Sequence, residues 1–210
     1  MKKHIAVRAI TEGAIMLALA TVLSLFKLFQ LPQGGSVNLS MIPILFYCVR
    51  WGVWKGTLVG LADGILQMLL DGATAWGWQS ILLDYVLAFS LLGLSGIVYK
   101  TADAGSMFEL RSGEKVGPVA VMYRPPFGVF LGPVIGVLAR FLAHFYSGVT
   151  VFRLVAPTKL LGHTYVNPYS YSAMYNGSFL LIDLVICMVV FALLYKPLKK
   201  YFLRRDLVKE

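Results

Sequence analysis

The sequence predicts an all-α integral membrane protein. We expect a single domain, residues 1–210, built as a bundle of six transmembrane helices with cytoplasmic N- and C-termini. Of the 210 residues, 58% are hydrophobic and only 14% are charged, and the mean hydropathy is +0.74. Ordinary soluble domains do not have this composition. Apolar runs recur along the whole length, so the membrane part is the protein itself and not an anchor for a soluble domain.

The orientation follows from the Lys and Arg residues. With both termini in the cytoplasm, the inner ends of the apolar runs carry 15 of these residues and the outer loops carry three: Lys27, Arg153 and Lys159. Such a bias marks the cytoplasmic side of a membrane protein. The net charge of +9 therefore belongs to the inner surface and does not indicate a nucleic-acid partner. The first apolar run is long and no small-residue cleavage pattern follows it, so no cleavable signal peptide is expected.

The predicted spans are about 8–30, 38–54, 57–71, 81–99, 127–149 and 174–196. The second and third are short, and only a tight turn at Trp51 and Gly52 separates them. Cys48 and Cys187 both lie inside apolar runs, where cysteine acts as a small hydrophobic residue. Neither a disulfide nor a metal site is expected from them.

The first span carries Ala14 and Ala18, a small-xxx-small pair that lets another helix approach closely. The spacing alone is compatible either with packing within the bundle or with docking of a partner protein. Glycines at the same spacing recur in the third and fifth spans, and these we assign to packing within the bundle. They are Gly56, Gly60 and Gly64, and Gly128, Gly132 and Gly136.

Two outer loops carry features with more than one interpretation. Pro32 and the Gly34-Gly35 pair make a flexible turn, which is either a hinge over a site or simply a turn. In the second outer loop, Trp76 and Trp78 come near the membrane surface. They form either an interfacial belt or aromatic faces for a cation.

We single out three ionisable residues inside or at the edge of apolar runs, because charged groups are rare there and usually functional. Asp84 lies just inside the outer boundary of the fourth span and needs a partner or a cationic ligand. Arg140 and His144 are four residues apart in the fifth span, so both lie on one face of a helix. A structural pair between Asp84 and this face is the alternative to a ligand site. A further alternative is an Arg that reaches the interface beside a structural His.

Several polar and aromatic residues fall toward the outer side of the membrane. They offer a carboxylate, neutral hydrogen-bonding groups and aromatic faces, which suit a small, flat, cationic ligand. The set is Asp84, Tyr85, His144, Tyr171, Asn176, Phe152 and the two Trp residues. No nucleophile is placed with a base and an orienting group, so no enzyme is predicted. The chain also has no nucleotide-binding motif, so a partner would have to power uptake.

Four stretches in this order carry a resemblance to a known family: Leu31-Pro-Gln-Gly-Gly-Ser-Val37 with Met41-Ile-Pro-Ile44, Leu82-Leu-Asp-Tyr85, Arg140-Phe-Leu-Ala-His144 followed by Ser147-Gly148, and Tyr171-Ser-Ala-Met-Tyr-Asn176. The sequence resembles the thiamine-specific substrate-binding (S) components of energy-coupling factor (ECF) transporters over nearly its whole length. Order and spacing together are more specific than any one stretch.

The resemblance implies a six-helix S component in a prokaryotic plasma membrane. Such a protein captures thiamine from outside with high affinity, without a cofactor of its own. It then docks on a membrane scaffold subunit (EcfT type) and two ATPase subunits, which use the ATP. Ala14 and Ala18 match the face that S components turn toward the scaffold.

The resemblance also implies site residues. Asp84 corresponds to an acidic position that is Glu in several members, and His144, Tyr171 and Asn176 match ligand-contacting positions. Phe152 falls where some relatives place a stacking Trp. Gly34, near Asn38 in the first outer loop, falls where some members carry a Trp. We therefore expect the thiazolium to be held differently here, with Trp76 or Trp78 as replacements.

Within this resemblance we expect Asp84 and Tyr85 to fix the polar groups of the ligand. His144, Tyr171 and Asn176 would read its aminopyrimidine, and Phe152 would stack on it. Arg140 is expected to pair behind the site, because a cation beside a cationic ligand would repel it. Asn38, in the first outer loop, is also expected to contact the ligand. Three alternatives remain: an S component for another vitamin or a thiamine precursor, a membrane-embedded enzyme, and a stand-alone secondary transporter.

Overall fold

The computed structural model describes residues 2–31, 34–71, 77–100, 127–155, 158–160, 162–204 and 206–207. Its long helices are α1 (Lys2–Ser24), α2 (Met41–Trp51), α3 (Val53–Asp71), α8 (Phe127–Val155) and α9 (Pro168–Phe202). A further membrane-spanning stretch consists of four consecutive helical segments. They are α4 (Trp78–Ser80), the π-helical η2 (Ile81–Leu87), α5 (Ala88–Leu91) and the 3-10 helix η3 (Leu92–Lys100). Two small antiparallel hairpins complete the described chain: β1 (Phe29–Gln30) with β2 (Ser36–Val37), and β3 (Thr158–Leu160) with β4 (His163–Tyr165).

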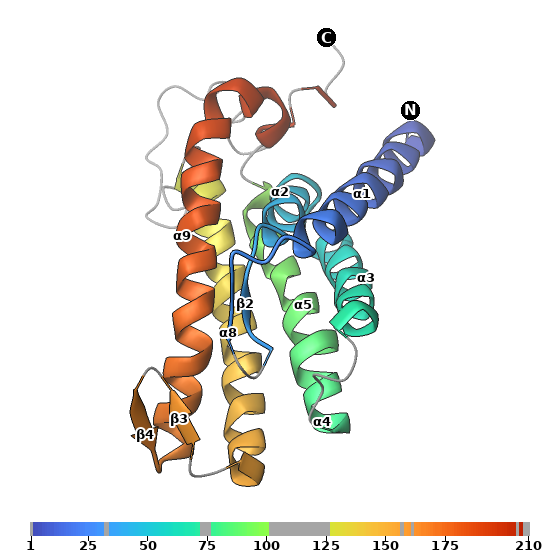
Figure 1. Ribbon diagram of the computed structural model, residues 1–210. Coiled ribbons are helices and arrows are strands. Elements are labelled where there is room, and N and C mark those ends of the chain that lie inside the picture. Colours follow the sequence, from blue (N-terminus) through green and yellow to red (C-terminus); the bar gives the residue numbers. More distant parts are fainter. Residues whose placement is uncertain are drawn as a thin grey trace, which may run out of the picture.

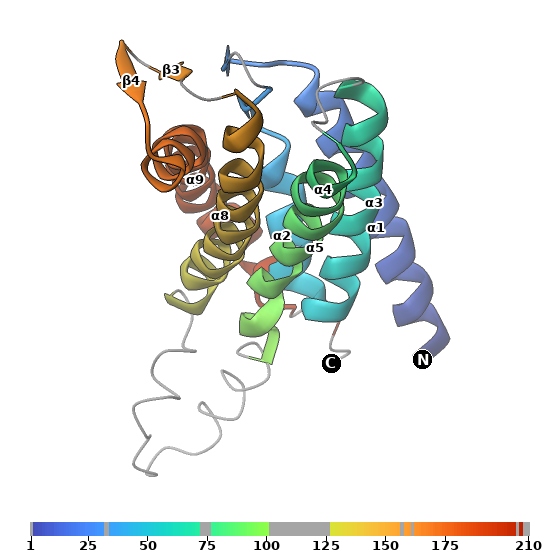
Figure 2. The same ribbon diagram turned by 90° about the horizontal axis from the view of Figure 1, so that it is seen from below.

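The prediction of an all-α membrane protein is confirmed. Among the described residues, five helical stretches are long and apolar enough to cross a membrane, and α2 is a shorter apolar helix packed among them. The two chain ends lie at the same end of the bundle, and the β3–β4 hairpin lies at the opposite end (Figures 1 and 2). We call the end with the termini the inner end, following the predicted orientation.

The helix ends differ from the predicted spans for local reasons. Helix α1 stops at Ser24, short of the predicted end, because Leu28 N–H donates to the Val37 carbonyl (2.9 Å) and the chain enters the β1–β2 hairpin. Helix α9 begins six residues before the predicted span because Asn167 caps it. The Asn167 side chain accepts from the N–H of Tyr169 at 2.8 Å, and Pro168 fits the first helical position.

The crossing from α4 to η3 packs very closely on α3. A Cβ at Gly60 would collide with the carbonyl oxygen of Phe89, and one at Gly64 with that of Tyr85. A Cβ at Gly132 in α8 would likewise meet the Ser95 carbonyl oxygen at 2.5 Å. The assignment of these glycines to packing within the bundle is therefore confirmed. This packing fixes the π-helical turn that carries Asp84; such turns occur frequently at functional sites.

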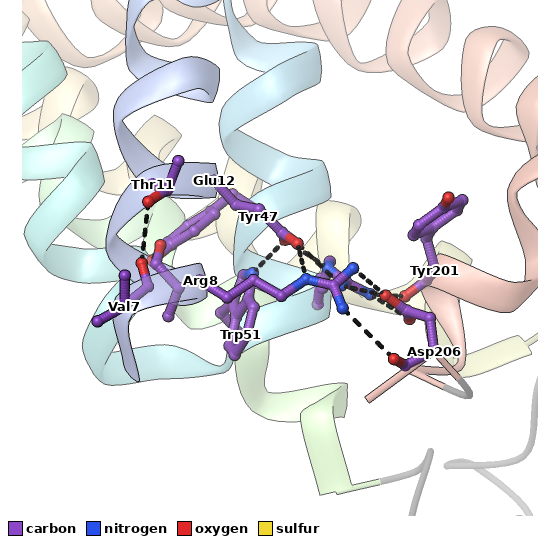
Figure 3. Close-up of polar contacts among 10 residues, drawn as sticks. Val7, Arg8, Thr11, Glu12, Tyr47, Trp51, Tyr201 and Asp206 are labelled. Carbon is purple, nitrogen blue, oxygen red and sulfur yellow. Dashed lines mark hydrogen bonds and ion pairs between the residues drawn. The ribbon is translucent and has the colours of Figure 1, made fainter. Parts of the chain in front are cut away.

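The inner end holds a partly buried ionic cluster formed by Arg50, Glu12, Asp206 and Arg8. Figure 3 shows Arg8, Glu12 and Asp206 of this cluster. Arg50 is only 1% exposed, and its Nε donates to Glu12 Oε2 at 2.6 Å while its Nη1 donates to Asp206 Oδ1 at 2.9 Å. Arg8 donates to both carboxylates as well. Burial acts to raise the pKa of the Asp206 carboxyl, but the hydrogen bonds and charges of Arg50 and Arg8 outweigh it and lower that pKa. The cluster joins α1, α2 and the segment after α9.

Candidate functional site

A cavity lies between the helices toward the outer end of the bundle. Helices α3, α8 and α9, the η2–α5 region and the β1–β2 hairpin all contribute to it. Its lining combines ionisable groups, neutral hydrogen-bonding groups and aromatic rings, with few aliphatic side chains. Such a mixture is what a site for a small polar, aromatic ligand requires.

The carboxylate of Asp84 in the cavity wall has three hydrogen-bond partners. It accepts from Ser80 Oγ at 2.7 Å and from Ser147 Oγ at 2.6 Å, and its Oδ1 lies 2.8 Å from His144 Nδ1. These donors come from α4 and α8, so they hold the π-helical turn against α8. The three donors fix the orientation of this carboxylate in the cavity wall.

The tautomer of His144 follows from its two neighbours. Arg140 Nε lies 3.1 Å from His144 Nε2, and an arginine can only donate. Nε2 must therefore be the unprotonated nitrogen, and Nδ1 carries the proton that it donates to Asp84. The result is an aligned chain in which Arg140 donates to a neutral His144, which donates to Asp84.

Arg140 lies in the wall of the cavity. Its guanidinium stacks over the Phe89 ring, 4.0 Å from the centroid, and its charge interacts with the carboxylates of Asp183, Asp63 and Asp84. The pairing predicted for Arg140 is therefore present, with His144 as the hydrogen-bond partner. The residue nevertheless lines the cavity instead of standing behind it. The carboxylates around it offset its charge.

Asn176 and Tyr171 form the α9 side of the cavity. The amide Nδ2 of Asn176 donates to the carbonyl oxygens of His144 (3.1 Å) and Ser172 (3.0 Å). This orients its Oδ1 as an acceptor, and no hydrogen bond to that oxygen occurs within the part of the chain that the structure describes. The Tyr171 ring stacks on Tyr175 with centroids 5.7 Å apart.

The structure brings most of the predicted site residues to this one cavity. Those that line it are Asp84, Tyr85, Arg140, His144, Tyr171, Asn176, Gly34 and Asn38. Trp78 does not line it and is 72% exposed on α4. Trp76, like Pro32, lies outside the described residues, and so does the side chain of Phe152, although its backbone belongs to α8. The aromatic rings observed in the lining are instead those of Phe89, Phe179 and the tyrosines.

Sequence reasoning missed three buried residues of α9 that line the cavity: Tyr175, Phe179 and Asp183. It also missed Asp63 on α3, which hydrogen-bonds to the cavity-lining Gln67 at 3.1 Å. Asp63 and Asp183 are lone carboxylates inside apolar runs. Like Asp84, both are rare charged groups in apolar runs, and this signal in the sequence marks them as candidate functional residues.

Comparison with known proteins agrees with this architecture. The family model described as "Thiamine transporter protein (Thia_YuaJ)" matches residues 10–203. The chain belongs to this family. It is 31% identical over 186 residues to the thiamine transporter ThiT of Bacillus subtilis (strain 168), covering 88% of each chain. It is 29% identical over 210 residues to the ThiT of Lacticaseibacillus paracasei, covering 98% of this chain and 96% of that protein.

A solved structure has the same fold. The structure of ThiT from Listeria monocytogenes superposes with a TM-score of 0.73 at 25% identity, over 94% of this chain and 98% of that one. Family membership also bears on the alternatives left open by the sequence. The relatives are named as transporters, which is a non-enzymatic role, so the prediction that the protein is not an enzyme is confirmed.

Proposed function

We propose that this member of the Thia_YuaJ family is an S component that binds thiamine from outside the cell with high affinity. It delivers thiamine to an ECF module made of a membrane scaffold subunit and two ATPase subunits in a prokaryotic plasma membrane. The names of its relatives as thiamine transporters support the ligand. The cavity at the outer end of a bundle of membrane helices supports capture from that side.

The observation that carries this proposal is the Asp84 carboxylate, held by three donors in the wall of the cavity. A carboxylate inside a membrane bundle needs a positive partner. The permanent cation of a thiazolium ring supplies one. Because Ser80, Ser147 and His144 all donate to Asp84, the carboxylate is already oriented before the ligand arrives. Little reorganisation is then needed on binding, which favours high affinity.

The aminopyrimidine of thiamine would be recognised by residues on the α8 and α9 side of the cavity. Asn176 offers its Oδ1 as an acceptor for an exocyclic amine, and the hydroxyls of Tyr85 and Tyr171 supply further polar contacts. His144 already uses both ring nitrogens, with Arg140 and Asp84. A hydrogen bond from His144 to the ligand would therefore have to replace one of these two.

Docking on the scaffold subunit would use the outward face of α1. Ala14 and Ala18 both lie on the exposed side of this helix, whereas Gly13 faces inward, where a Cβ would lie 3.1 Å from the Tyr47 ring. Small residues on a lipid-facing stripe allow another helix to approach closely. The nucleotide chemistry is then left to the ATPase subunits.

Uptake into proteoliposomes tests this division of labour. The protein is reconstituted alone or with a complete ECF module, and entry of radiolabelled thiamine is followed with and without internal ATP. We expect accumulation only with the module and ATP. Accumulation by the protein alone would support the stand-alone secondary transporter and contradict the proposal. Accumulation of a pyrimidine precursor in preference to thiamine would support the alternative ligand.

A further inference from the structure

The β1–β2 hairpin forms one wall of the cavity, and its described backbone is well defined by internal hydrogen bonds. The N–H of Leu31 donates to the Gly35 carbonyl at 2.7 Å, and Phe29 pairs with Val37. Two residues of this segment, Leu31 and Val37, have buried side chains. Four residues of its second half and the following turn line the cavity: Gly34, Gly35, Ser36 and Asn38. The position of this segment therefore determines how closed the cavity is.

A single face of α9 lies against this segment. Tyr175, Phe179 and Asp183 are spaced four residues apart, so they form one stripe along the helix. All three are buried and all three line the cavity. We call these three side chains the α9 stripe.

Two backbone amides of the hairpin segment donate to the stripe. The N–H of Gly35 donates to Tyr175 Oη at 2.8 Å. The N–H of Asn38 donates to Asp183 Oδ1 at 3.1 Å. These are bonds from main chain to side chain across 140 and 145 residues of sequence, so they report tertiary docking and not local turn geometry. A carboxyl group has an oxygen that can accept from an amide whether or not the group is protonated.

Phe179, the middle residue of the α9 stripe, limits how closely the hairpin segment approaches α9. A Cβ on Gly35 would lie 2.9 Å from Cε1 of Phe179 and 3.0 Å from Tyr175 Oη. Gly35 is therefore needed for the backbone to reach the tyrosine hydroxyl. The Phe179 ring in turn contacts His144 edge-on, with centroids 6.0 Å apart. The stripe thus touches both the hairpin segment and the polar chain that ends at Asp84.

We propose that Tyr175 and Asp183 are positioning residues that hold the 34–38 segment against α9 over the ligand cavity. Their role is to set how long bound thiamine stays in the site, and they act through the backbone of Gly35 and Asn38. This proposal rests on the proposed function for the identity of the ligand. The hydrogen bonds themselves are features of the ligand-free protein and can be tested without it.

Amide hydrogen exchange of the full-length, ligand-free protein in nanodiscs tests the contact directly. Tyr175→Phe removes the acceptor for the Gly35 N–H and keeps the ring. We expect exchange at Gly35 to accelerate roughly 2- to 12-fold, the loss that corresponds to one neutral hydrogen bond. The matched control is Tyr195→Phe, which removes a tyrosine hydroxyl from the same helix near Phe130 and Phe202. Exchange at Gly35 that stays at the wild-type rate in Tyr175→Phe would overturn the proposal.

A pair of variants at Asp183 separates its hydrogen bond from its charge. Asp183→Asn keeps an acceptor oxygen at the position that Asn38 N–H uses, whereas Asp183→Leu removes it. We expect exchange at Asn38 to rise much more in Asp183→Leu than in Asp183→Asn. Equal exchange in both variants and in the wild type would show that Asp183 does not hold the segment. Thermal unfolding of each variant verifies that the bundle is folded.

Thiamine dissociation kinetics connect the contact to function. Bound thiamine is chased with excess unlabelled ligand, and its release is compared for wild type, Tyr175→Phe and Tyr195→Phe. We expect Tyr175→Phe to release thiamine faster by about the same factor as its Gly35 exchange increases, with an association rate that does not fall. Faster release without faster exchange would mean that Tyr175 contacts the ligand directly and would overturn its positioning role. If the wild type binds no thiamine, the proposed function fails, while the exchange experiment still decides the contact.

Discussion

At the scale of single residues, the site depends on a short chain of directed hydrogen bonds. Arg140 donates to His144 Nε2, and His144 Nδ1 donates to Asp84, which also accepts from Ser80 and Ser147. Each bond fixes the next one, since arginine cannot accept and a neutral imidazole has one donor and one acceptor. The chain therefore presents one oriented carboxylate to the cavity.

Replacing this carboxylate should reduce thiamine binding strongly. Asp84→Asn keeps the size of the side chain but removes its charge, so we expect affinity to fall by about 1.5–3 kcal/mol, as for the loss of a charged hydrogen-bond partner. Asp84→Glu keeps the charge and is the matched control. Isothermal titration calorimetry measures both. Wild-type affinity in Asp84→Asn would show that charge at this position does not hold the ligand.

The supporting hydroxyl should matter less than the carboxylate. Ser147→Ala removes the donor that lies 2.6 Å from Asp84 Oδ2 but leaves Ser80 and His144 in place. We expect a loss of about 0.5–1.5 kcal/mol in thiamine binding, the usual range for one hydrogen bond. Thr150→Ala is a suitable control, because its hydroxyl donates to a helix carbonyl, that of Ser147, at 2.7 Å. A loss in Ser147→Ala as large as in Asp84→Asn would mean that the hydroxyl contacts the ligand itself.

At the scale of helices and strands, close packing on glycine determines where the site residues lie. Gly60 and Gly64 let α3 approach the backbone of the crossing that carries Asp84 and Tyr85. The sequence predicted this packing from the four-residue spacing of the glycines. It could not predict the π-helical turn at Ile81–Leu87, because an extra residue in a helical turn leaves no periodic signal.

A methyl group should be tolerated very differently at two glycines of the bundle. In Gly60→Ala the new Cβ meets a backbone oxygen that cannot move away, so we expect a loss of stability of about 1–3 kcal/mol. In Gly177→Ala, within α9, the nearest atom is Phe141 Cε2 at 3.8 Å, an ordinary contact. This control should be neutral or stabilised by up to about 1 kcal/mol through helix propensity. Thermal unfolding in detergent compares them, and equal stability of the two variants would contradict the packing described.

The elements that the sequence missed are those set by contacts between distant segments. The end of α1 and the start of α9 depend on the β1–β2 hairpin and on the Asn167 cap, whereas apolar runs report only the span of hydrophobic residues. Residues of the cavity wall could be predicted where an ionisable residue stood out in an apolar run, as at Asp84 and His144. The wall formed by Tyr175 and Phe179 could not, because an aromatic residue in an apolar run does not stand out from its neighbours.

At the scale of the whole molecule, the inner-end cluster ties the two ends of the chain to the bundle. Arg50 is held by Glu12 of α1 and by Asp206 after α9. Helix α1 is otherwise little buried, since only 17% of its apolar window lies inside the protein. The cluster therefore helps to fix the helix that carries the proposed docking face, at the opposite end from the proposed thiamine cavity.

Breaking this cluster on one side should destabilise the protein markedly. Glu12→Gln leaves the buried Arg50 with a single carboxylate, and removing one partner of a buried ion pair costs about 3–5 kcal/mol. Glu12 is partly exposed, so we expect the lower end of that range. Thermal unfolding measures the change. The double variant Glu12→Gln with Arg50→Met should recover part of the loss, and no recovery would contradict the pairing.

Acid should weaken the same cluster. The pKa of Asp206 is lowered in the folded protein from its ordinary value of 3.8. Its contribution to stability is therefore fully present above that value and is lost as the pH falls through the lower folded pKa. We expect the unfolding temperature of the wild type to fall below pH 3.8 more steeply than that of Asp206→Asn. Parallel curves for the two proteins would show that Asp206 is not stabilised in the fold.

Titration of the purified protein with thiamine, followed by tryptophan fluorescence, tests whether the protein binds thiamine as a whole molecule. We expect saturable binding at submicromolar thiamine, with the separate pyrimidine and thiazole fragments binding far more weakly, because Asp84 and the α9 side chains would recognise different parts of one ligand. Absence of saturable binding, or a pyrimidine fragment that binds as tightly as thiamine, would contradict this expectation.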